Sequence, residues 1–318
     1  MGKVAFVFPG QGSQIVGMAQ ELASEYKEVQ AVIDQADEKL GYKLSSLMFE
    51  GPQEELTLTY NAQPALLTSS IAILQLLKQA GITADYTAGH SLGEYSALVA
   101  AEAISFEDAV YTVHMRGKYM EEAVPAGVGS MAAVLGLEAG LLKEACEEAS
   151  VEAGPVQLAN LNCPGQIVIS GSAQGVSLAS EKAKEKGAKR VIPLVVSGPF
   201  HSSLMKPAAS KLEDTLSSIS INDSTVPVIA NVDANEMKSA SEIPVKLVEQ
   251  LYSPVRWEQS VVKLIDLGVD TFIEVGPGKV LSGLIKKVNR RATTIPVYDK
   301  ETLQKAIDHF KGEESTNA

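Results

Sequence analysis

The sequence has few of the residues from which metal centres and disulfide frameworks are built. Its 318 residues include two cysteines and four histidines. Cys146 and Cys163 are too few for a disulfide framework, and they lack the paired spacing of a zinc site. We therefore expect a reducing compartment, no bound metal and no cofactor.

Positive charge is also scarce, and long apolar runs are absent. Lys and Arg number 27 against 39 Asp and Glu, which gives a formal net charge of −12. Binding to nucleic acid or to an anionic membrane needs clustered positive charge, so neither is expected as a partner. No apolar stretch approaches the roughly 20 residues that span a bilayer. The apolar start at 4–8 breaks at Pro9 without a signal-peptide cleavage pattern, so the sequence predicts a cytoplasmic protein.

The middle of the chain has a pattern of predicted strands and helices that differs from that of the segments on either side. For a chain of this length we expect about two domains, or one large domain with an insertion. The pattern predicts strands at 131–135, 156–159, 166–170 and 191–195, with helices at 138–149 and 173–186. This β-α-β-β-α-β order is ferredoxin-like. We predict an inserted small domain, 127–196, within a larger α/β domain built from 1–126 and 197–318.

The segment Gly89-His90-Ser91-Leu92-Gly93 matches G-x-S-x-G, with a short strand predicted before it and a helix after it. Glycines are needed there because a sharp strand-to-helix turn crowds the backbone around the serine. The turn exposes Ser91 and aims the first N–H groups of the helix, that of Leu92 among them, at a developing oxyanion. Five-residue matches also arise by chance, but this context predicts that Ser91 is a nucleophile.

A serine nucleophile needs a base, and His201 remains after the other histidines are considered. Those others are His90, His114 and His309. The first adjoins Ser91 on a strand and points to the opposite face, the second falls on the polar side of a helix at 106–123, and the third is near the C-terminus. His201 follows a strand on a loop, where bases are commonly found. The alternative is a hydrogen-bonded structural histidine.

Arg116 falls at the edge of the apolar face of the helix at 106–123. A guanidinium there needs an anionic partner, because a buried unpaired charge is costly. That partner is either an internal carboxylate or the carboxylate of a substrate, held by a fork of N–H groups. A third alternative is that the long side chain reaches solvent. Periodicity alone leaves these alternatives open.

Gly10-Gln11-Gly12 begins like a dinucleotide-binding loop, but Ile15 stands where the third glycine would be. A dinucleotide site is therefore not expected. Gln11, between two glycines after a buried strand, is better placed to lend an N–H to an oxyanion or a carbonyl.

Five segments together resemble one family, the malonyl-CoA:acyl carrier protein transacylases. They are FPGQGSQ at 8–14, GHSLGE at 89–94, Arg116-Gly117, GPFH at 198–201 and EVGPG at 274–278. The resemblance runs from the first strand to about Lys287. It implies an α/β-hydrolase-like core with an inserted ferredoxin-like domain.

The resemblance also implies roles at matching positions. Ser91 would carry the malonyl group, His201 would be the base, and Arg116 would bind the malonyl carboxylate. Backbone N–H groups of Gln11 and Leu92 would form the oxyanion hole. Residues implied near the substrate pocket or in support of it are Gln63, the weaker candidates Asn160 and Asn162, and Gln250, whose backbone carbonyl would orient His201.

The implied activity is transfer of malonyl from malonyl-CoA to the phosphopantetheine thiol of acyl carrier protein, through a Ser91 acyl-enzyme, for fatty acid biosynthesis. Alternatives are a discrete polyketide-type acyltransferase and a serine esterase or thioesterase. Acyl carrier proteins are acidic, so docking calls for a local basic surface. Two clusters qualify, although both also fit ordinary solvated helix faces: Lys182, Lys184, Lys186, Lys189 and Arg190, and Lys286, Lys287, Arg290 and Arg291.

Overall fold

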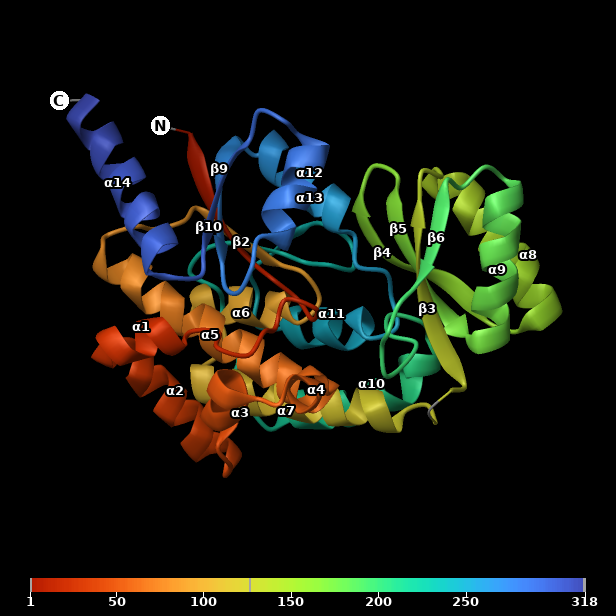
Figure 1. Cartoon of the computed structure of the whole chain (residues 1–318), viewed down its shortest axis with the longest axis horizontal. Coiled ribbons are helices and arrows are strands. Elements are labelled where there is room, and N and C mark those ends of the chain that lie inside the picture. The colour runs from red at the N-terminus through yellow and green to blue at the C-terminus, as the bar shows by residue number, and fades with distance from the viewer. Residues whose placement is uncertain (1, 126, 317–318) are drawn as a thin grey trace.

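The computed structural model describes residues 2–125 and 127–316 and has a mixed α/β fold (Figure 1). A six-stranded sheet has the order β10-β9-β1-β2-β7-β8, parallel except where β8 pairs antiparallel with β7. Its strands are β1 (Lys3–Phe8), β2 (Tyr86–Gly89), β7 (Val228–Ile229), β8 (Glu236–Met237), β9 (Val269–Val275) and β10 (Thr293–Val297). The N-terminal strand therefore lies in the middle of the sheet, next to β2, whose end carries the G-x-S-x-G segment.

Apolar layers cover both faces of this sheet, as expected for parallel strands. Side chains of β1 alternate between two hydrophobic clusters: Phe6 and Phe8 belong to one, Ala5 and Val7 to the other. The helices around the sheet are α1 (Gln20–Glu25), α2 (Lys27–Leu40), α3 (Leu44–Glu50), α4 (Gln53–Thr57), α5 (Thr59–Gln79), α6 (Gly93–Ala100), α7 (Phe106–Glu122), α10 (Lys206–Ser217), α11 (Ile243–Gln250), α12 (Trp257–Asp266), α13 (Val280–Val288) and α14 (Lys300–Thr316), with a 3-10 turn at Ser203–Met205.

A second sheet of four antiparallel strands, ordered β4-β5-β3-β6, lies beside the first part and carries α8 and α9 on one face (Figure 1). Its elements are β3 (Gly129–Leu135), α8 (Ala139–Ala153), β4 (Val156–Cys163), β5 (Gln166–Ser172), α9 (Ala173–Glu185) and β6 (Arg190–Pro193). The six elements predicted from the sequence are present in the predicted order. A separate hydrophobic cluster fills the space between the sheet and its two helices.

Strand β4 also ties the small sheet to the rest of the molecule. The N–H of Leu161 donates to the carbonyl of Val255 at 2.9 Å, and the N–H of Val255 donates to the carbonyl of Ala159 at 2.8 Å. Since Val255 lies two residues before α12, the two parts meet through backbone hydrogen bonds at the start of that helix. Within the described residues, no helix has the length and apolarity needed to cross a membrane.

Candidate active site

Ser91 lies in the tight turn between β2 and α6. Its φ of 52° is in the left-handed region, which is uncommon for a residue with a side chain. A Cβ built on Gly89 would lie 1.9 Å from the backbone of Gly93, and one on Gly93 would lie 2.1 Å from the carbonyl oxygen of Phe8. The crowding predicted for this turn is therefore present, and both glycines are required by close backbone approach.

His201 contacts Ser91 directly. Its Nε2 lies 2.8 Å from Ser91 Oγ, and its Nδ1 lies 2.8 Å from the backbone carbonyl of Gln250. Because a carbonyl only accepts, Nδ1 carries the proton and Nε2 is left to accept the serine proton. Burial, followed by the positive charge of Arg116, lowers the pKa of His201 to about 3. The imidazole is thus neutral at physiological pH, as a base must be.

The other histidines are held elsewhere. Nε2 of His90 lies 2.8 Å from Asn162 Oδ1 on β4, and Nδ1 of His114 lies 2.7 Å from the carbonyl of Tyr60. The expectation that His114 lies on a polar face is wrong: it is buried, because α7 packs against α5 on that side. His309 is on α14, far along the chain from the turn.

Arg116 is buried in α7, with 1% of its surface exposed. One terminal nitrogen donates to Gln63 Oε1 at 2.8 Å, and the other donates to Gln250 Oε1 at 2.8 Å and to Ser91 Oγ at 3.2 Å. Among the residues that the structure describes, no carboxylate lies within ion-pair distance of it. Neither an internal ion pair nor a path to solvent therefore explains this residue, and desolvation lowers its pKa.

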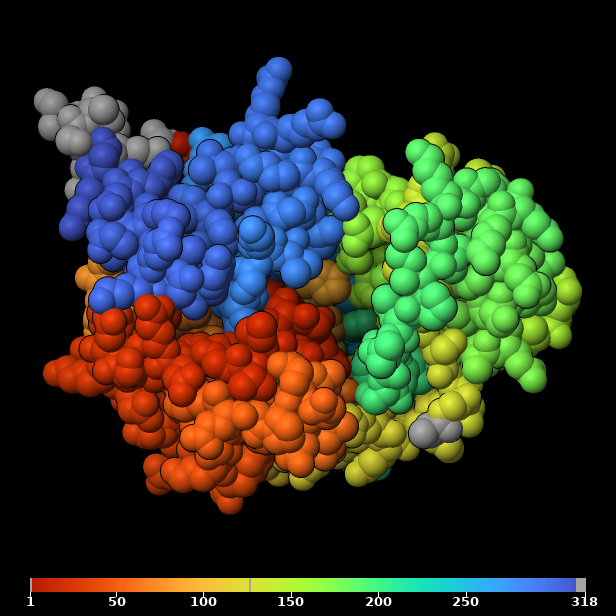
Figure 2. All heavy atoms as spheres, in the orientation of Figure 1, coloured from red at the N-terminus to blue at the C-terminus, as the bar shows by residue number. Residues whose placement is uncertain are grey.

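A pocket of about 240 Å³ opens onto Ser91 and His201. Figure 2 shows the surface hollowed where the red and orange N-terminal segments face the green segment near residue 195. The lining residues are Gln11, Gly12, Gln14, Thr57, His90, Ser91, Met120, Met131, Asn160, Leu194, Val195, Val196, Phe200 and His201. Both parts of the molecule thus contribute walls to the pocket.

The remaining predicted residues fall into two groups. Gln11 and Asn160 line the pocket, Gln11 from the loop after β1 and Asn160 from β4 of the small sheet. Leu92 follows Ser91 at the start of α6, while Gln63 and Gln250 are fully buried behind the pocket and contact the guanidinium of Arg116. Gln250 therefore does more than the sequence indicates, since its side chain as well as its backbone carbonyl reaches the site.

Sequence reasoning missed several polar residues that hold these groups. Asn231, just after β7, accepts the N–H of Ser91 at 2.8 Å and donates to the carbonyl of Gly89 at 2.7 Å. Glu94 accepts from Gln250 Nε2 at 2.6 Å. Gln157 of β4 donates to the carbonyl of His201 at 3.2 Å. The usable signal for Asn231 was a polar residue just past a short apolar segment, because β7 is parallel to β2 and ends at the same sheet edge.

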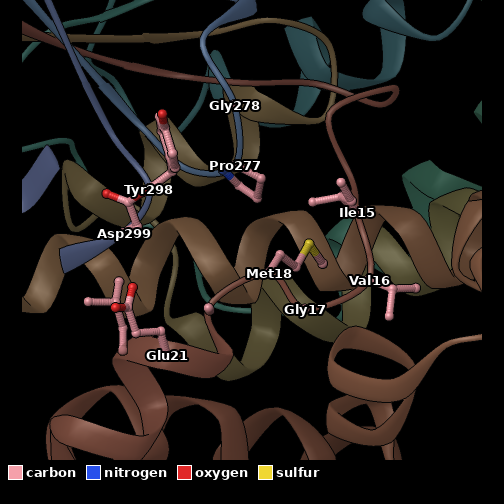
Figure 3. A pocket seen from close by; sticks show the side chains of 11 residues that line it. Ile15, Val16, Gly17, Met18, Glu21, Pro277, Gly278, Tyr298 and Asp299 are labelled. Atoms are coloured by element: carbon pink, nitrogen blue, oxygen red, sulfur yellow. The ribbon is translucent and has the colours of Figure 1, made fainter. Parts of the chain in front are cut away.

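A second pocket, of about 260 Å³, lies between the segment Ile15–Leu22 and the loops at Pro277 and Tyr298 (Figure 3). Figure 3 shows Tyr298 and Asp299 on one side and Ile15 and Met18 on the other. None of its lining residues is a serine, cysteine or histidine. The candidate nucleophile Ser91 and the candidate base His201 both line the first pocket.

The two basic clusters differ in structure. Lys182 on α9 and Lys186 at its C-cap form ion pairs with carboxylates of α8; the shortest are 2.9 Å from Lys182 to Glu152 and 3.0 Å from Lys186 to Glu148. In the second cluster, Lys287 donates to Gln166 Oε1 at 2.9 Å and Lys286 to the carbonyl of Ala292 at 2.6 Å. All four side chains of that second cluster are exposed, and none of them forms an ion pair within the described part of the chain.

Comparison with known proteins finds relatives that match along nearly the whole chain. The model of the acyl transferase domain family matches residues 5–313. The malonyl CoA-acyl carrier protein transacylase of Bacillus subtilis is 64% identical over 318 residues, which is 100% of both chains. Among solved structures, the transacylase of that name from Clostridium perfringens has a TM-score of 0.96 at 42% identity, covering 99% of each chain.

A malonyl-transacylase solved in complex with a type II PKS acyl-carrier protein has a TM-score of 0.94 at 43% identity, with 96% of this chain and 99% of that chain covered. The family model, the full-length relative and the solved structures each cover nearly the whole chain. The chain therefore belongs to the malonyl CoA-acyl carrier protein transacylase family.

Proposed function

We propose that the protein transfers malonyl from malonyl-CoA to the phosphopantetheine thiol of acyl carrier protein, through an ester on Ser91. The observation that carries this function is Arg116: a buried guanidinium 3.2 Å from the nucleophile, with no ion-pair partner among the described side chains. A carboxylate on the acyl group would supply the missing anion, and two N–H donors match its geometry. The names of the relatives support the same substrates.

The first half-reaction loads the serine. Ser91 Oγ attacks the thioester carbonyl carbon while its proton passes to His201 Nε2, 2.8 Å away. We assign stabilisation of the oxyanion to the backbone N–H groups of Leu92, at the start of α6, and of Gln11. The C–S bond then breaks, and the departing sulfur of CoA takes the proton from His201.

The second half-reaction reverses these steps with a different thiol. The carrier thiol gives its proton to His201 and attacks the Ser91 ester, whose Oγ leaves and recovers the proton. A thioester is exchanged for a thioester, so the difficulty lies in excluding water and holding the acyl group in position. Arg116 serves this purpose by fixing the far end of the malonyl group.

For the architecture, we propose the finer assignment as well. The parallel sheet with a serine turn after β2 supports an α/β-hydrolase-like core built from 1–126 and 197–318. The antiparallel order β4-β5-β3-β6 and a separate apolar core support a ferredoxin-like domain at 127–196. Residue 126, at the proposed boundary, lies outside the described residues. Both cysteines are free and buried, which supports a reducing location such as the cytoplasm.

For the carrier, the exposed cluster Lys286, Lys287, Arg290 and Arg291 is the better docking surface. An acidic partner would meet these charges without first displacing internal carboxylates, whereas Lys182 and Lys186 already hold glutamates of α8. The carrier is proposed to serve fatty acid synthesis, and a polyketide carrier is a second candidate because one relative was solved with such a partner.

Intact-mass measurement tests the function. Brief incubation with malonyl-CoA is expected to add one malonyl group to the wild type and none to Ser91→Ala. Addition of carrier protein bearing its phosphopantetheine arm is expected to discharge the adduct onto the carrier thiol. Free malonate without a lasting adduct would instead identify a hydrolase and contradict the transfer.

A further inference from the structure

Glu94 is a fully buried carboxylate that the mechanism above does not use. It lies in the first turn of α6, three residues after Ser91, with none of its surface exposed. Burial raises its pKa to about 7, against the opposing effect of hydrogen bonds from Gln250 and Asn231 and of the charge of Arg116. A carboxylate kept at such a cost next to the nucleophile calls for a reason.

Its hydrogen bonds link the groups that build the site. Oε2 of Glu94 accepts from the side-chain Nε2 of Gln250 at 2.6 Å and from the backbone N–H of Asn231 at 3.3 Å. The same Gln250 side chain presents Oε1 to Arg116 at 2.8 Å. A line of contacts therefore runs from Glu94 through one amide to the carboxylate-binding arginine.

The chemistry of an amide makes this line directional. The two ends of the Gln250 side chain have nearly the same shape, but one end donates and the other accepts. With a carboxylate at one end, the NH₂ group is held there and the oxygen must face the guanidinium. Without an acceptor at position 94, the NH₂ group keeps only its longer contacts, to the carbonyl of Ser91 at 3.0 Å and to Asn231 Oδ1 at 3.3 Å. The amide is then held less firmly, and in its turned orientation the NH₂ group would face Arg116, which can only donate.

We propose that Glu94 is a positioning residue for malonyl selectivity: it fixes the Gln250 amide so that Oε1 holds Arg116 in the orientation that receives the substrate carboxylate. This inference rests on the proposed malonyl transfer. It predicts a specific defect, because an acetyl group carries no carboxylate and does not need Arg116. The ratio of malonyl to acetyl loading is therefore the quantity that reports on Glu94.

Two variants separate the hydrogen-bond acceptor from the side-chain volume. Glu94→Gln keeps an oxygen that can accept from Gln250 and Asn231, whereas Glu94→Met has similar length and no comparable acceptor. Glu274→Met is the matched control. Glu274 is also fully buried, but it accepts from the N–H groups of Leu281 and Ser282 at 2.9 and 2.7 Å and so caps α13.

The experiment measures the rate constants of Ser91 loading by malonyl-CoA and by acetyl-CoA, with rapid quenching and intact mass. For Glu94→Met we expect the malonyl-to-acetyl ratio to fall about tenfold or more, the range for a charge-assisted hydrogen bond. For Glu94→Gln the ratio should stay within about threefold of the wild type, and for Glu274→Met it should be unchanged even where the melting temperature falls.

An unchanged ratio in Glu94→Met, or an equal loss in Glu94→Gln, would overturn the inference. If Glu94→Met does not fold, Glu94→Asp is measured in its place: it withdraws the carboxylate by one methylene, and the same fall in ratio is expected while an unchanged ratio counts against the role. Failure of the wild type to form a malonyl adduct would instead refute the proposed function, so the two failures are distinguishable.

Discussion

Cations in two parts of the molecule have opposite surroundings. On α9, Lys182 and Lys186 lie near the surface, and each pairs with two glutamates of α8. In the core of the larger part, Arg116 is buried. It donates hydrogen bonds to the uncharged oxygens of Gln63, Gln250 and Ser91 and lies over the ring of Tyr95. The two solvated lysines have carboxylate partners within the chain, whereas the buried guanidinium has none among the described residues, and we propose that the substrate supplies its anion.

The comparison shows that an exposed, paired lysine and a buried, unpaired arginine make different contributions to the free energy of folding. A paired lysine on a helix face contributes little, because solvent screens the pair and the long side chains lose freedom in forming it. A buried arginine without a carboxylate costs folding free energy and is retained only where binding recovers it. The following predictions, from the largest expected effect to the smallest, test this difference.

The largest effect is expected for the carboxylate near Arg116. In the folded protein the pKa of Glu94 is about 7, above its ordinary 4.5, so the native state holds a proton that the unfolded chain has lost. The stability of the wild type should therefore fall as pH rises from about 4.5 to 7, relative to Glu94→Gln. The difference reaches up to about 3 kcal/mol at 1.36 kcal/mol per pKa unit.

Denaturant unfolding of both proteins at several pH values measures this difference. It should be smallest near pH 4.5, grow to about pH 7 and then stay constant. His201 acts in the opposite sense, since its pKa of about 3 makes the wild type lose stability as pH falls below its ordinary 6.5. Because His201 is present in both proteins, its contribution cancels. A difference in stability that does not vary with pH would show that folding does not raise the pKa of Glu94.

The next effect is expected for Arg116→Ala. Removing the fork should weaken malonyl recognition by about 1.5 to 3 kcal/mol, the range for hydrogen bonds to charged groups. Acetyl loading should change much less, because acetyl has no carboxylate. The measurement is the loading rate with each thioester. Equal losses for both would make Arg116 a structural residue and remove the contrast with the α9 lysines.

The sequence predicts a residue of this site only where the evidence for it lies in the residues next to it along the chain. Ser91 is flanked by glycines that a tight turn requires, and Arg116 lies at the edge of a clear apolar face on α7. Both residues, and the turn and helix that carry them, are therefore predictable from the sequence. In the sequence, Glu94 has the pattern of an ordinary acidic residue in the first turn of a helix. Nothing in its neighbours along the chain shows that Gln250 and Asn231 donate hydrogen bonds to it. Such contacts depend on tertiary packing between distant segments.

The basic cluster at 182–190 is a second case in which contacts between distant segments could not be predicted from the local sequence. Residues 182–190 look like one positive surface along the chain, but α8 packs beside α9 and brings Glu144, Glu148 and Glu152 against two of the lysines. The order of elements in that region was predictable from periodicity and turn residues. The pairing of Lys182 and Lys186 was not, because it follows from which faces of the two helices meet.

A smaller effect is expected at the exposed cluster near the C-terminus. Changing Lys286, Lys287, Arg290 and Arg291 to glutamate should slow discharge of the malonyl adduct onto the carrier by about tenfold at low ionic strength, because like charges then face each other. Added salt should reduce the difference, since exposed charges are screened beyond about 10 Å at 0.1 M. Loading from malonyl-CoA is the control and should be unaffected. Equal discharge rates at low salt would exclude this surface from docking.

The smallest effect is expected for Lys182→Ala with Lys186→Ala. Both ammonium groups are already satisfied by α8, so an approaching carrier would have to compete with carboxylates held 2.9 to 3.6 Å away. Discharge onto the carrier should stay within about twofold of the wild type at low salt, and the melting temperature should change little because partly exposed pairs contribute weakly. A fall in the discharge rate as large as that for the C-terminal cluster would mean that a lysine paired within the chain still binds the carrier. The contrast with Arg116 would then rest on burial alone.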